Sequence, residues 1–258
     1  MTISQFIQQL SETPALWITV ILTLGVILVN GWTDAPNAIA TCVATRAMKP
    51  RNAIAMAAVF NFLGVLVMTL LSPKVAETIY NMVDFGSNAH EASIALSAAM
   101  FAIVVWAVLA WAFGIPTSES HALIAGITGS AIAMHNNLDG VNGAEWGKVL
   151  FGLVFSLVIG FALGYAVTKL IQRLCRRMNY RKANGFFDKG QVVAAAGTAF
   201  MHGAQDGQKF MAIFLLGEAF SRGDAAGGVF TVPLWLMLVC SAVMGLGTSV
   251  GGYRIIKA

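Results

Sequence analysis

Three short polar segments interrupt long apolar stretches of this sequence. They are residues 30–37 (NGWTDAPN), residues 114–121 (GIPTSESH) and residues 202–209 (HGAQDGQK), called below the first, second and third polar segments. A charge at the centre of a bilayer costs about 2.5–3.5 kcal/mol on insertion scales, so such residues commonly mark ion or substrate pathways. The ionisable groups of the three segments, histidines apart, are Asp34, Glu119, Asp206 and Lys209.

The second polar segment indicates an anion-binding helix N-terminus. Gly114 and Pro116 favour a chain break, and the hydroxyl groups of Thr117, Ser118 and Ser120 follow it. The free N–H groups and the positive dipole end of a new helix would point at an oxyanion together with these hydroxyls. The competing interpretation is an ordinary N-cap, with the serines bonded to the backbone.

A count of formal charges predicts that a cation accompanies the anion. At helical spacing, Asp34 and Asn37 share one polar face, and Gln205, Asp206 and Lys209 share another. Three carboxylates and one lysine give these segments a charge of −2 before any anion binds. Adding an anion in a low dielectric requires compensation, which Na⁺ on oxygen ligands or protons on the carboxylates could supply. For Asp206 and Lys209 a purely structural ion pair is the alternative.

The first and third polar segments also begin two copies of an internal repeat. Residues 30–40 align with residues 202–212 at a constant offset of 172, the difference between 30 and 202. An odd number of predicted spans separates the copies, so they must cross the membrane in opposite directions. Both copies place an Asp beside Gly or Pro, which predicts broken helices within an inverted repeat, a transporter architecture. The identical pairs are Gly31 with Gly203, Asp34 with Asp206, and Ala40 with Ala212.

The elements that must position these segments are membrane-spanning helices. The chain is 57% hydrophobic and 11% charged, against about 25% charged residues in soluble domains. A helix of about 20 apolar residues crosses a bilayer, and the fold class is therefore an all-α polytopic membrane bundle. The expected spans are 15–45, 52–71, 93–113, 115–134, 149–168, 191–217 and 229–251. Residues 93–134 form either two crossings or one re-entrant hairpin.

Charge distribution predicts the orientation and the units of the chain. Lys and Arg concentrate between the first two spans and over residues 172–190, so these loops are expected in the cytoplasm and the N-terminus outside a plasma membrane. The expected units are a first repeat over 1–171, a basic loop over 172–190, and the start of a second repeat over 191–258. The net charge of +4 does not indicate nucleic-acid binding, because the chain has no soluble domain on whose surface the basic residues could cluster. No cofactor is expected beyond a transported ion.

The three segments resemble the signatures of the inorganic phosphate transporter family of cation-coupled symporters. The resemblance covers essentially the whole chain and implies phosphate and Na⁺ or H⁺ bound at mid-membrane. Two positions depart from the family pattern: Gln205 stands where Asn is usual, and no second Pro-Ser/Thr element appears before Ala258. The residues so assigned to phosphate are Thr117, Ser118, Ser120, Gln205 and Lys209; those assigned to the cation are Asp34, Asn37, Glu119 and Asp206, with Asp34, Asn37 and Asp206 as Na⁺ ligands.

Several alternatives stay open at this point. A symporter of sulfate or another tetrahedral oxyanion would use the same donors. An intramembrane aspartyl protease would need two aspartates, here Asp34 and Asp206, yet neither follows a Gly-x-Gly sequence. A homodimer is also left open. Because the second repeat shows only two spans, we expect the encoded protein to continue, or a second polypeptide to complete it; otherwise the third polar segment would face lipid or an unfilled groove.

Overall fold

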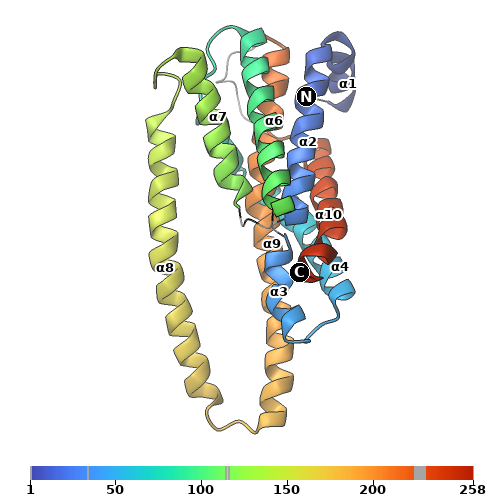
Figure 1. The fold of residues 1–258 in the computed structure, drawn as a ribbon, viewed down its shortest axis with the longest axis vertical. Helices are drawn as coiled ribbons and strands as arrows, with labels where there is room; N and C mark the ends of the chain where they lie inside the picture. Colours follow the sequence, from blue (N-terminus) through green and yellow to red (C-terminus); the bar gives the residue numbers. More distant parts are fainter. Residues whose placement is uncertain (1, 34, 114, 116, 224–230, 258) are drawn as a thin grey trace.

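The computed structural model describes residues 2–33, 35–113, 115, 117–223 and 231–257, and these residues are almost entirely helical (Figure 1). Extended pairing in these ranges is limited to one isolated antiparallel bridge between Val83 and Val141. The helices are α1 (Ile3–Glu12), α2 (Pro14–Thr33), α3 (Ala35–Ala44), α4 (Pro50–Leu71), α5 (Lys74–Tyr80), α6 (Ala89–Phe113), α7 (Glu119–His135), α8 (Gly143–Cys175), α9 (Tyr180–Ser221) and α10 (Leu234–Lys257).

Within the described ranges, four apolar stretches are long enough to cross a membrane. They are Leu16–Ala44, which comprises α2 and α3, and the helices α4, α6 and α8. The apolar part of α10, Leu234–Val250, is shorter. A helix satisfies its own backbone hydrogen bonds, which lipid cannot do. The protein is thus an all-helical membrane protein, as the hydropathy predicts.

The long helix α9 forms the centre of the bundle and packs against α2, α3, α4, α5, α6 and α10. It meets α4 through two glycines. A Cβ on Gly64 would collide with the carbonyl of Phe200, and a Cβ on Gly203 would collide with the backbone of Asn61. The absence of side chains at these two positions therefore lets the helix backbones touch, as in small-residue helix contacts within membranes.

The third polar segment lies inside α9, which continues unbroken from Tyr180 to Ser221. The expected break in the second repeat copy is therefore wrong. A glycine inside a helix lowers the stability of the helix by only about 1 kcal/mol relative to alanine, so a glycine alone does not end a helix. Gly203 and Gly207 serve packing instead, because a Cβ on Gly207 would crowd the side chain of Val65.

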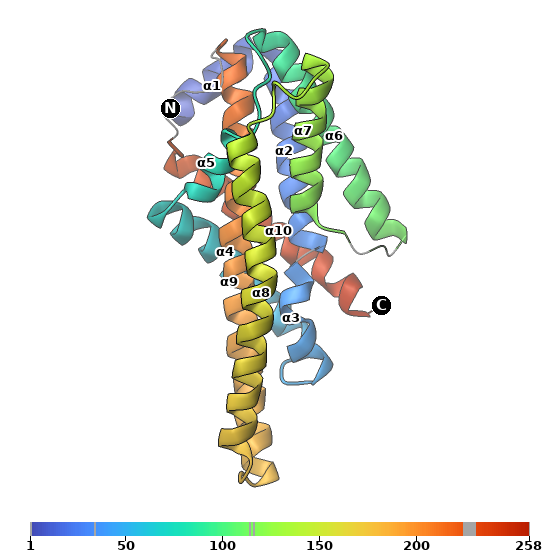
Figure 2. The ribbon, with the colours of Figure 1, turned by 90° about the vertical axis from the view of Figure 1, so that its left-hand side faces the viewer.

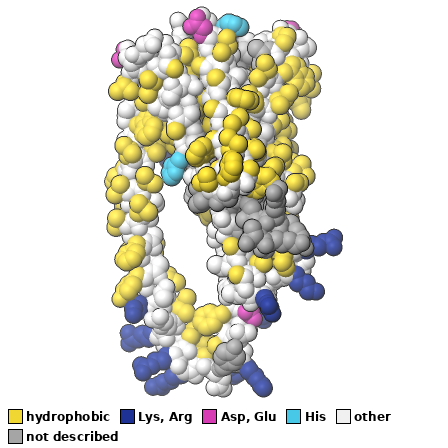
Figure 3. Space-filling view, viewed as in Figure 1, with side chains coloured by type: hydrophobic (Ala, Val, Ile, Leu, Met, Phe, Trp, Pro, Cys, Tyr) yellow, Lys and Arg dark blue, Asp and Glu magenta, His cyan; other side chains and the backbone are white. Residues whose placement is uncertain are grey.

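The basic segment 172–190 is also mostly helical. Only residues 176–179 connect α8 to α9, and the remaining basic residues lie on the last turns of α8 and the first turns of α9. Figures 1 and 2 show these two helices extending together beyond the other helices of the bundle. In the space-filling view, Lys and Arg side chains gather at this end and along the adjacent side, and most of the visible acidic side chains lie at the opposite end (Figure 3).

Helices α6 and α7 form an adjacent pair whose connection lies near mid-height in Figure 1, at the level where α2 meets α3. Both the start of α6 and the end of α7 lie at the end of the bundle that carries α1. This arrangement favours the re-entrant hairpin over two full crossings of residues 93–134. The hairpin places the N-terminus of α7 in the interior of the bundle.

Candidate functional site

The polar segments converge at mid-height, where the end of α2, the start of α7 and the middle of α9 meet (Figure 1). The first and third segments approach this level from opposite ends of the molecule, because α2 runs toward the basic end and α9 runs away from it. This is the antiparallel relation expected for inverted copies. That the protein contains two complete repeats of opposite orientation stays a prediction.

Asp206, Lys209 and Ser120 form the centre of the candidate site. Lys209 Nζ lies 2.6 Å from Asp206 Oδ1 and donates a hydrogen bond to Ser120 Oγ, also at 2.6 Å. The Ser120 hydroxyl in turn donates to Asp206 Oδ1 at 3.0 Å. The Asp206 and Lys209 side chains retain 9% and 16% of their accessible area. The local pairing considered from the sequence is therefore confirmed, and α7 contributes a hydroxyl to it.

Amide and imidazole groups contact the other carboxylate oxygen of Asp206, Oδ2. Asn30 Nδ2 donates to Asp206 Oδ2 at 3.2 Å, and His202 Nε2 lies 3.4 Å from the same oxygen. The Nδ1 atom of His202 lies 3.0 Å from Asn61 Oδ1. Asn61 also makes an interhelical hydrogen bond, because its Nδ2 atom donates to the hydroxyl of Thr248 of α10 at 3.0 Å.

These contacts determine the role of the Nδ1 atom of His202. The Thr248 hydroxyl donates its proton to the carbonyl of Met244, so its oxygen must accept from the Asn61 amide nitrogen. Asn61 Oδ1 then faces the imidazole and can only accept a hydrogen bond. His202 Nδ1 consequently carries a proton, and Nε2 is the atom that faces Asp206.

Glu119 occupies the first position of α7 and is fully buried, with 0% of its surface exposed. Its Oε1 atom lies 2.8 Å from the hydroxyl oxygen of Thr33, at the end of α2. Among the described residues, Oε2 is buried without a hydrogen-bond partner. Glu119 and Ser120 thus tie the start of α7 to both α2 and α9.

The remaining hydroxyls of the second polar segment are bound locally. Ser118 is the N-cap of α7, and its side chain accepts from the backbone N–H of His121 at 3.4 Å. Thr117 Oγ1 accepts from the indole N–H of Trp106 at 2.7 Å. The capping interpretation is therefore confirmed for Ser118. Both hydroxyls act as acceptors in these bonds, which leaves their protons for another group.

Two predicted site residues do not join the cluster in this conformation. Asn37 on α3 and Gln205 on α9 both have exposed side chains. Asp34 lies outside the described residues, as do Gly114 and Pro116. Within the described part of the chain, no three or more His, Cys, Asp or Glu side chains are placed to hold a metal ion. The Na⁺ set of Asp34, Asn37 and Asp206 thus stays untested.

The sequence suggested that, without further spans, the third polar segment would face lipid or an unfilled groove, and this does not hold for three of its polar residues. His202, Asp206 and Lys209 all find partners on α2, α4 or α7 of the same chain. The sequence did not identify Asn30, Thr33 and Thr248 as site residues. Asn30 and Thr33 are three residues apart within the first polar segment, a helical spacing that puts them on one face. No local signal marks Thr248.

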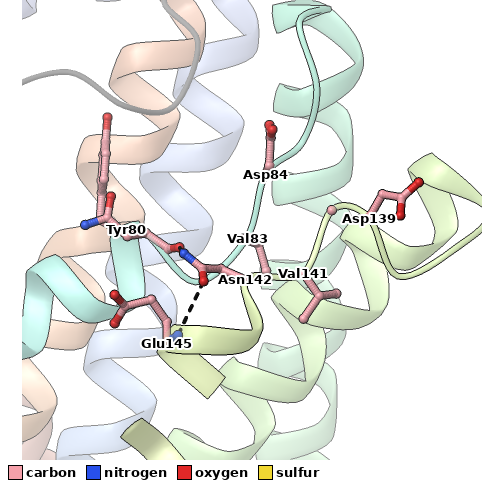
Figure 4. A pocket seen from close by; sticks show the side chains of 9 residues that line it. Tyr80, Val83, Asp84, Asp139, Val141, Asn142 and Glu145 are labelled. Atoms are coloured by element: carbon pink, nitrogen blue, oxygen red, sulfur yellow. Dashed lines mark hydrogen bonds between the residues drawn. The ribbon is translucent and has the colours of Figure 1, made fainter. Parts of the chain in front are cut away.

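A polar cavity of about 580 Å³ opens at the end of the bundle opposite the basic segment 172–190, and its lining includes Asp84, Asp139 and Glu145 (Figure 4). These carboxylates point apart rather than toward one ion. Each has its own neighbour: Asp84 accepts from the N–H of Gly86, Asp139 from the Asn137 amide, and Glu145 pairs with Lys148. This cavity is therefore a less convincing site than the mid-height cluster.

The fold and the site are those expected of a membrane transporter: a polytopic helical protein with a buried polar cluster of mixed charge where α2, α7 and α9 meet. Residues 30–258 match the sequence profile of the phosphate transporter family. The chain belongs to that family, which consists of transporters and not enzymes, so the protease alternative is set aside.

Individual relatives agree with this assignment. The chain is 36% identical over 238 residues to a Bacillus subtilis protein named "Probable low-affinity inorganic phosphate transporter", covering 92% of this chain and 69% of the relative. A Mycobacterium bovis protein of the same name is 33% identical over 94% of this chain, which spans 56% of that relative. The fold matches a solved structure described as "The sodium-dependent phosphate transporter", with a TM-score of 0.78, 18% identity, and coverage of 95% of this chain and 77% of the other. At that identity the likeness shows the fold alone.

Proposed function

We propose that this chain takes up inorganic phosphate together with a cation by alternating access. The observation that carries the proposal is the meeting of Lys209 Nζ and Ser120 Oγ, 2.6 Å apart, beside the N-terminus of α7. An ammonium group, a hydroxyl and the first N–H groups of a helix are donors that suit a tetrahedral oxyanion. The names of the relatives favour phosphate over sulfate as that oxyanion.

The phosphate site consists, in this proposal, of hydroxyl and ammonium donors around the start of α7. Thr117 and Ser118 have hydroxyl protons to offer, because their oxygens act as acceptors in the observed bonds. Ser120 donates to Asp206 here, so an incoming phosphate would have to replace that acceptor. Gln205 is exposed in this conformation and would join the anion only after α9 and its neighbours move relative to one another.

A coupling cation follows from the charges of the described cluster. Asp206 and Glu119 outnumber Lys209, which gives a formal charge of −1, and phosphate adds at least one further negative charge. Such an accumulation is unfavourable in a low dielectric unless a cation enters as well. Na⁺ at Asp34, Asn37 and Asp206, or H⁺ on a carboxylate, would satisfy this requirement.

The orientation proposed from charge is an N-terminus outside the plasma membrane and a cytoplasmic basic segment 172–190. The gathering of Lys and Arg at one end of the molecule supports it. Arg177→Cys should react with a membrane-impermeant thiol reagent in inside-out vesicles only, after Cys175, which is partly exposed, is replaced by Ala. Labelling from the outside of intact cells would reverse the assignment.

Uptake of labelled phosphate into proteoliposomes tests the transport function. We expect accumulation under an inward Na⁺ or H⁺ gradient, inhibited by arsenate and only weakly by sulfate. The membrane potential is clamped, so that an ion gradient alone supplies the driving force. Equal inhibition by sulfate would favour a broader oxyanion symporter, and rates independent of both gradients would refute cation coupling.

A further inference from the structure

The end of α8 and the start of α9 carry an exposed group of cations that the mid-height cluster does not use. This group, called below the basic surface, consists of Lys169, Arg173, Arg176, Arg177, Arg181, Lys182 and Lys189. All seven residues are exposed. An excess of Lys and Arg sets the orientation of a membrane protein, but it does not by itself say what these charges bind.

The chain supplies almost no counter-charge to the basic surface. Seven cations and one carboxylate, that of Asp188, give residues 169–189 a net charge of +6. Asp188 accepts a hydrogen bond from the side-chain amide of Asn184 at 3.3 Å. The ion pairs found among the described residues lie elsewhere in the bundle, at Glu145, Asp206 and Glu218. Anions from outside the chain must therefore balance this surface.

Large apolar side chains lie among these cations and are also exposed. Leu174 of α8 is 70% exposed, and Phe186 of α9 is 57% exposed. Lys169 Nζ lies 5.5 Å from the centre of the Tyr165 ring, a cation–π contact. Cations mixed with leucine and aromatic side chains are typical of segments at a bilayer interface, where the cations meet headgroups and the apolar groups enter the acyl boundary. This mixture favours a lipid surface over nucleic acid or an acidic protein.

The length of α8 places the basic surface at the level of the lipid headgroups. The helix has 33 residues, or about 50 Å of length, against about 30 Å of hydrocarbon. Its expected span ends at residue 168, immediately before Lys169. Residues 169–175 add about 10 Å, slightly more than a headgroup layer of about 5–8 Å on one side of the bilayer. Figures 1 and 2 show the start of α9 beside this end of α8, so both helices present cations to the headgroups.

We propose that the basic surface binds the phosphate groups of anionic phospholipids in the leaflet that it faces, with Leu174 and Phe186 at the acyl boundary. The proposal goes beyond the transport function and does not depend on it. Cations spread over two helices suit a layer of headgroups better than a free phosphate ion, which can contact only a few of them. An attraction of about 1 kcal/mol per cation corresponds to a roughly fivefold preference for an anionic lipid over a zwitterionic one.

Spin-labelled lipids measure this preference. The protein in phosphatidylcholine bilayers receives a trace of spin-labelled phosphatidylglycerol or phosphatidylcholine, and the spectrum gives the fraction of each lipid that the protein immobilises. We expect the wild type to favour phosphatidylglycerol severalfold, and Arg173→Gln/Arg176→Gln to lose most of this preference. The control Lys74→Gln/Lys148→Gln removes two exposed lysines outside the basic surface, lowers the net charge equally, and should keep the preference. An equal loss in the two double variants would overturn the proposal. Equal immobilisation of both lipids by the wild type would also overturn it and would favour an acidic macromolecule as the partner.

A spin label on Leu174 tests whether the lipid binds at the basic surface. Leu174 and Leu138 are both 70% exposed, but Leu138 lies between α7 and α8, in residues 136–142, which contain no Lys or Arg. Leu174→Cys and Leu138→Cys are labelled with Cys175 replaced by Ala, while Cys42 and Cys240 are buried. Adding phosphatidylglycerol to phosphatidylcholine bilayers should slow the label at position 174 and leave the label at position 138 unchanged. An equal change at both positions would refute the proposal, and the same change with inorganic phosphate alone would mean that the surface binds the free ion instead of lipid.

Discussion

Neutralising Asp206 should destabilise the protein chiefly by leaving Lys209 without its counter-charge. The two groups lie 2.6 Å apart, and their side chains retain only 9% and 16% of their accessible area. Breaking a buried ion pair by removing one partner costs about 3–5 kcal/mol, whereas replacing both partners with neutral residues is often close to neutral. We therefore expect Asp206→Asn and Lys209→Met each to lower the free energy of unfolding by about 3–5 kcal/mol, and the double variant to recover most of that loss.

The assay is a double-mutant cycle measured by equilibrium unfolding in mixed detergent micelles. The chain offers a matched control in Lys148 and Glu145, whose charged atoms also lie 2.6 Å apart but whose lysine is 63% exposed. An exposed pair contributes about 0–1 kcal/mol, because water screens it and its side chains lose entropy. The coupling energy of the buried pair should therefore exceed that of the control pair severalfold.

The result that would refute this reasoning is a buried pair that behaves like the exposed one. If Asp206→Asn is as stable as the wild type, the charge of Lys209 must be balanced by another group or by water in the folded protein. The ammonium would then be free to take phosphate without displacing Asp206. A large coupling energy would instead mean that phosphate must compete with Asp206 for the same lysine.

Three further changes test other parts of the structure. Ser120→Ala should raise the KM for phosphate by roughly 10- to 150-fold, which corresponds to about 1.5–3 kcal/mol for a hydrogen bond to a charged group. Ser156→Ala, on the exposed face of α8, should leave the KM unchanged, and equal KM values for the two variants would remove Ser120 from the phosphate site. Gly203→Ala should lower the free energy of unfolding by about 1–3 kcal/mol, because the added methyl group forces α9 away from α4. Gly197→Ala on the same helix meets open space and should raise the free energy of unfolding by about 0.5–1 kcal/mol. Identical unfolding midpoints for the two variants would contradict the close approach of the helices. Asn61→Leu should lower the free energy of unfolding by about 1–3 kcal/mol, because buried polar groups of α9 and α10 lose their hydrogen-bond partner. An unfolding curve that overlays the wild-type curve would argue against the hydrogen bonds that join Asn61 to His202 and Thr248.

Local sequence signals predicted the parts of the site that depend on neighbours in the chain. The spacing of Asp206 and Lys209 allowed an ion pair, and the sequence at Ser118 allowed an N-cap; both are present. Long apolar runs likewise predicted the spanning helices, because a bilayer imposes length and hydrophobicity on each helix separately. These features require no knowledge of how the helices are arranged.

Features that depend on contacts between distant helices could not be predicted in the same way. Thr33 meets Glu119, and Thr248 meets Asn61, across 86 and 187 residues of sequence. The continuity of α9 also depends on its neighbours, because Gly203 is tolerated there for the close approach of α4 that it permits. The short helices α1 and α5 were likewise not expected; α1 is held by Phe6 against Phe214 and Trp235.

The first and third polar segments share a packing role but differ in charge. Gly31 packs against the backbone of α10 as Gly203 packs against α4, which accounts for the shared glycine without any helix break. Asp206 has a built-in counter-cation three residues later in Lys209. The offset of 172 residues places Asn37 at the equivalent position of the first copy, so Asp34 has no lysine there. We therefore expect Asp34 to receive its counter-charge from the transported cation, which would have the role that Lys209 has in the third polar segment.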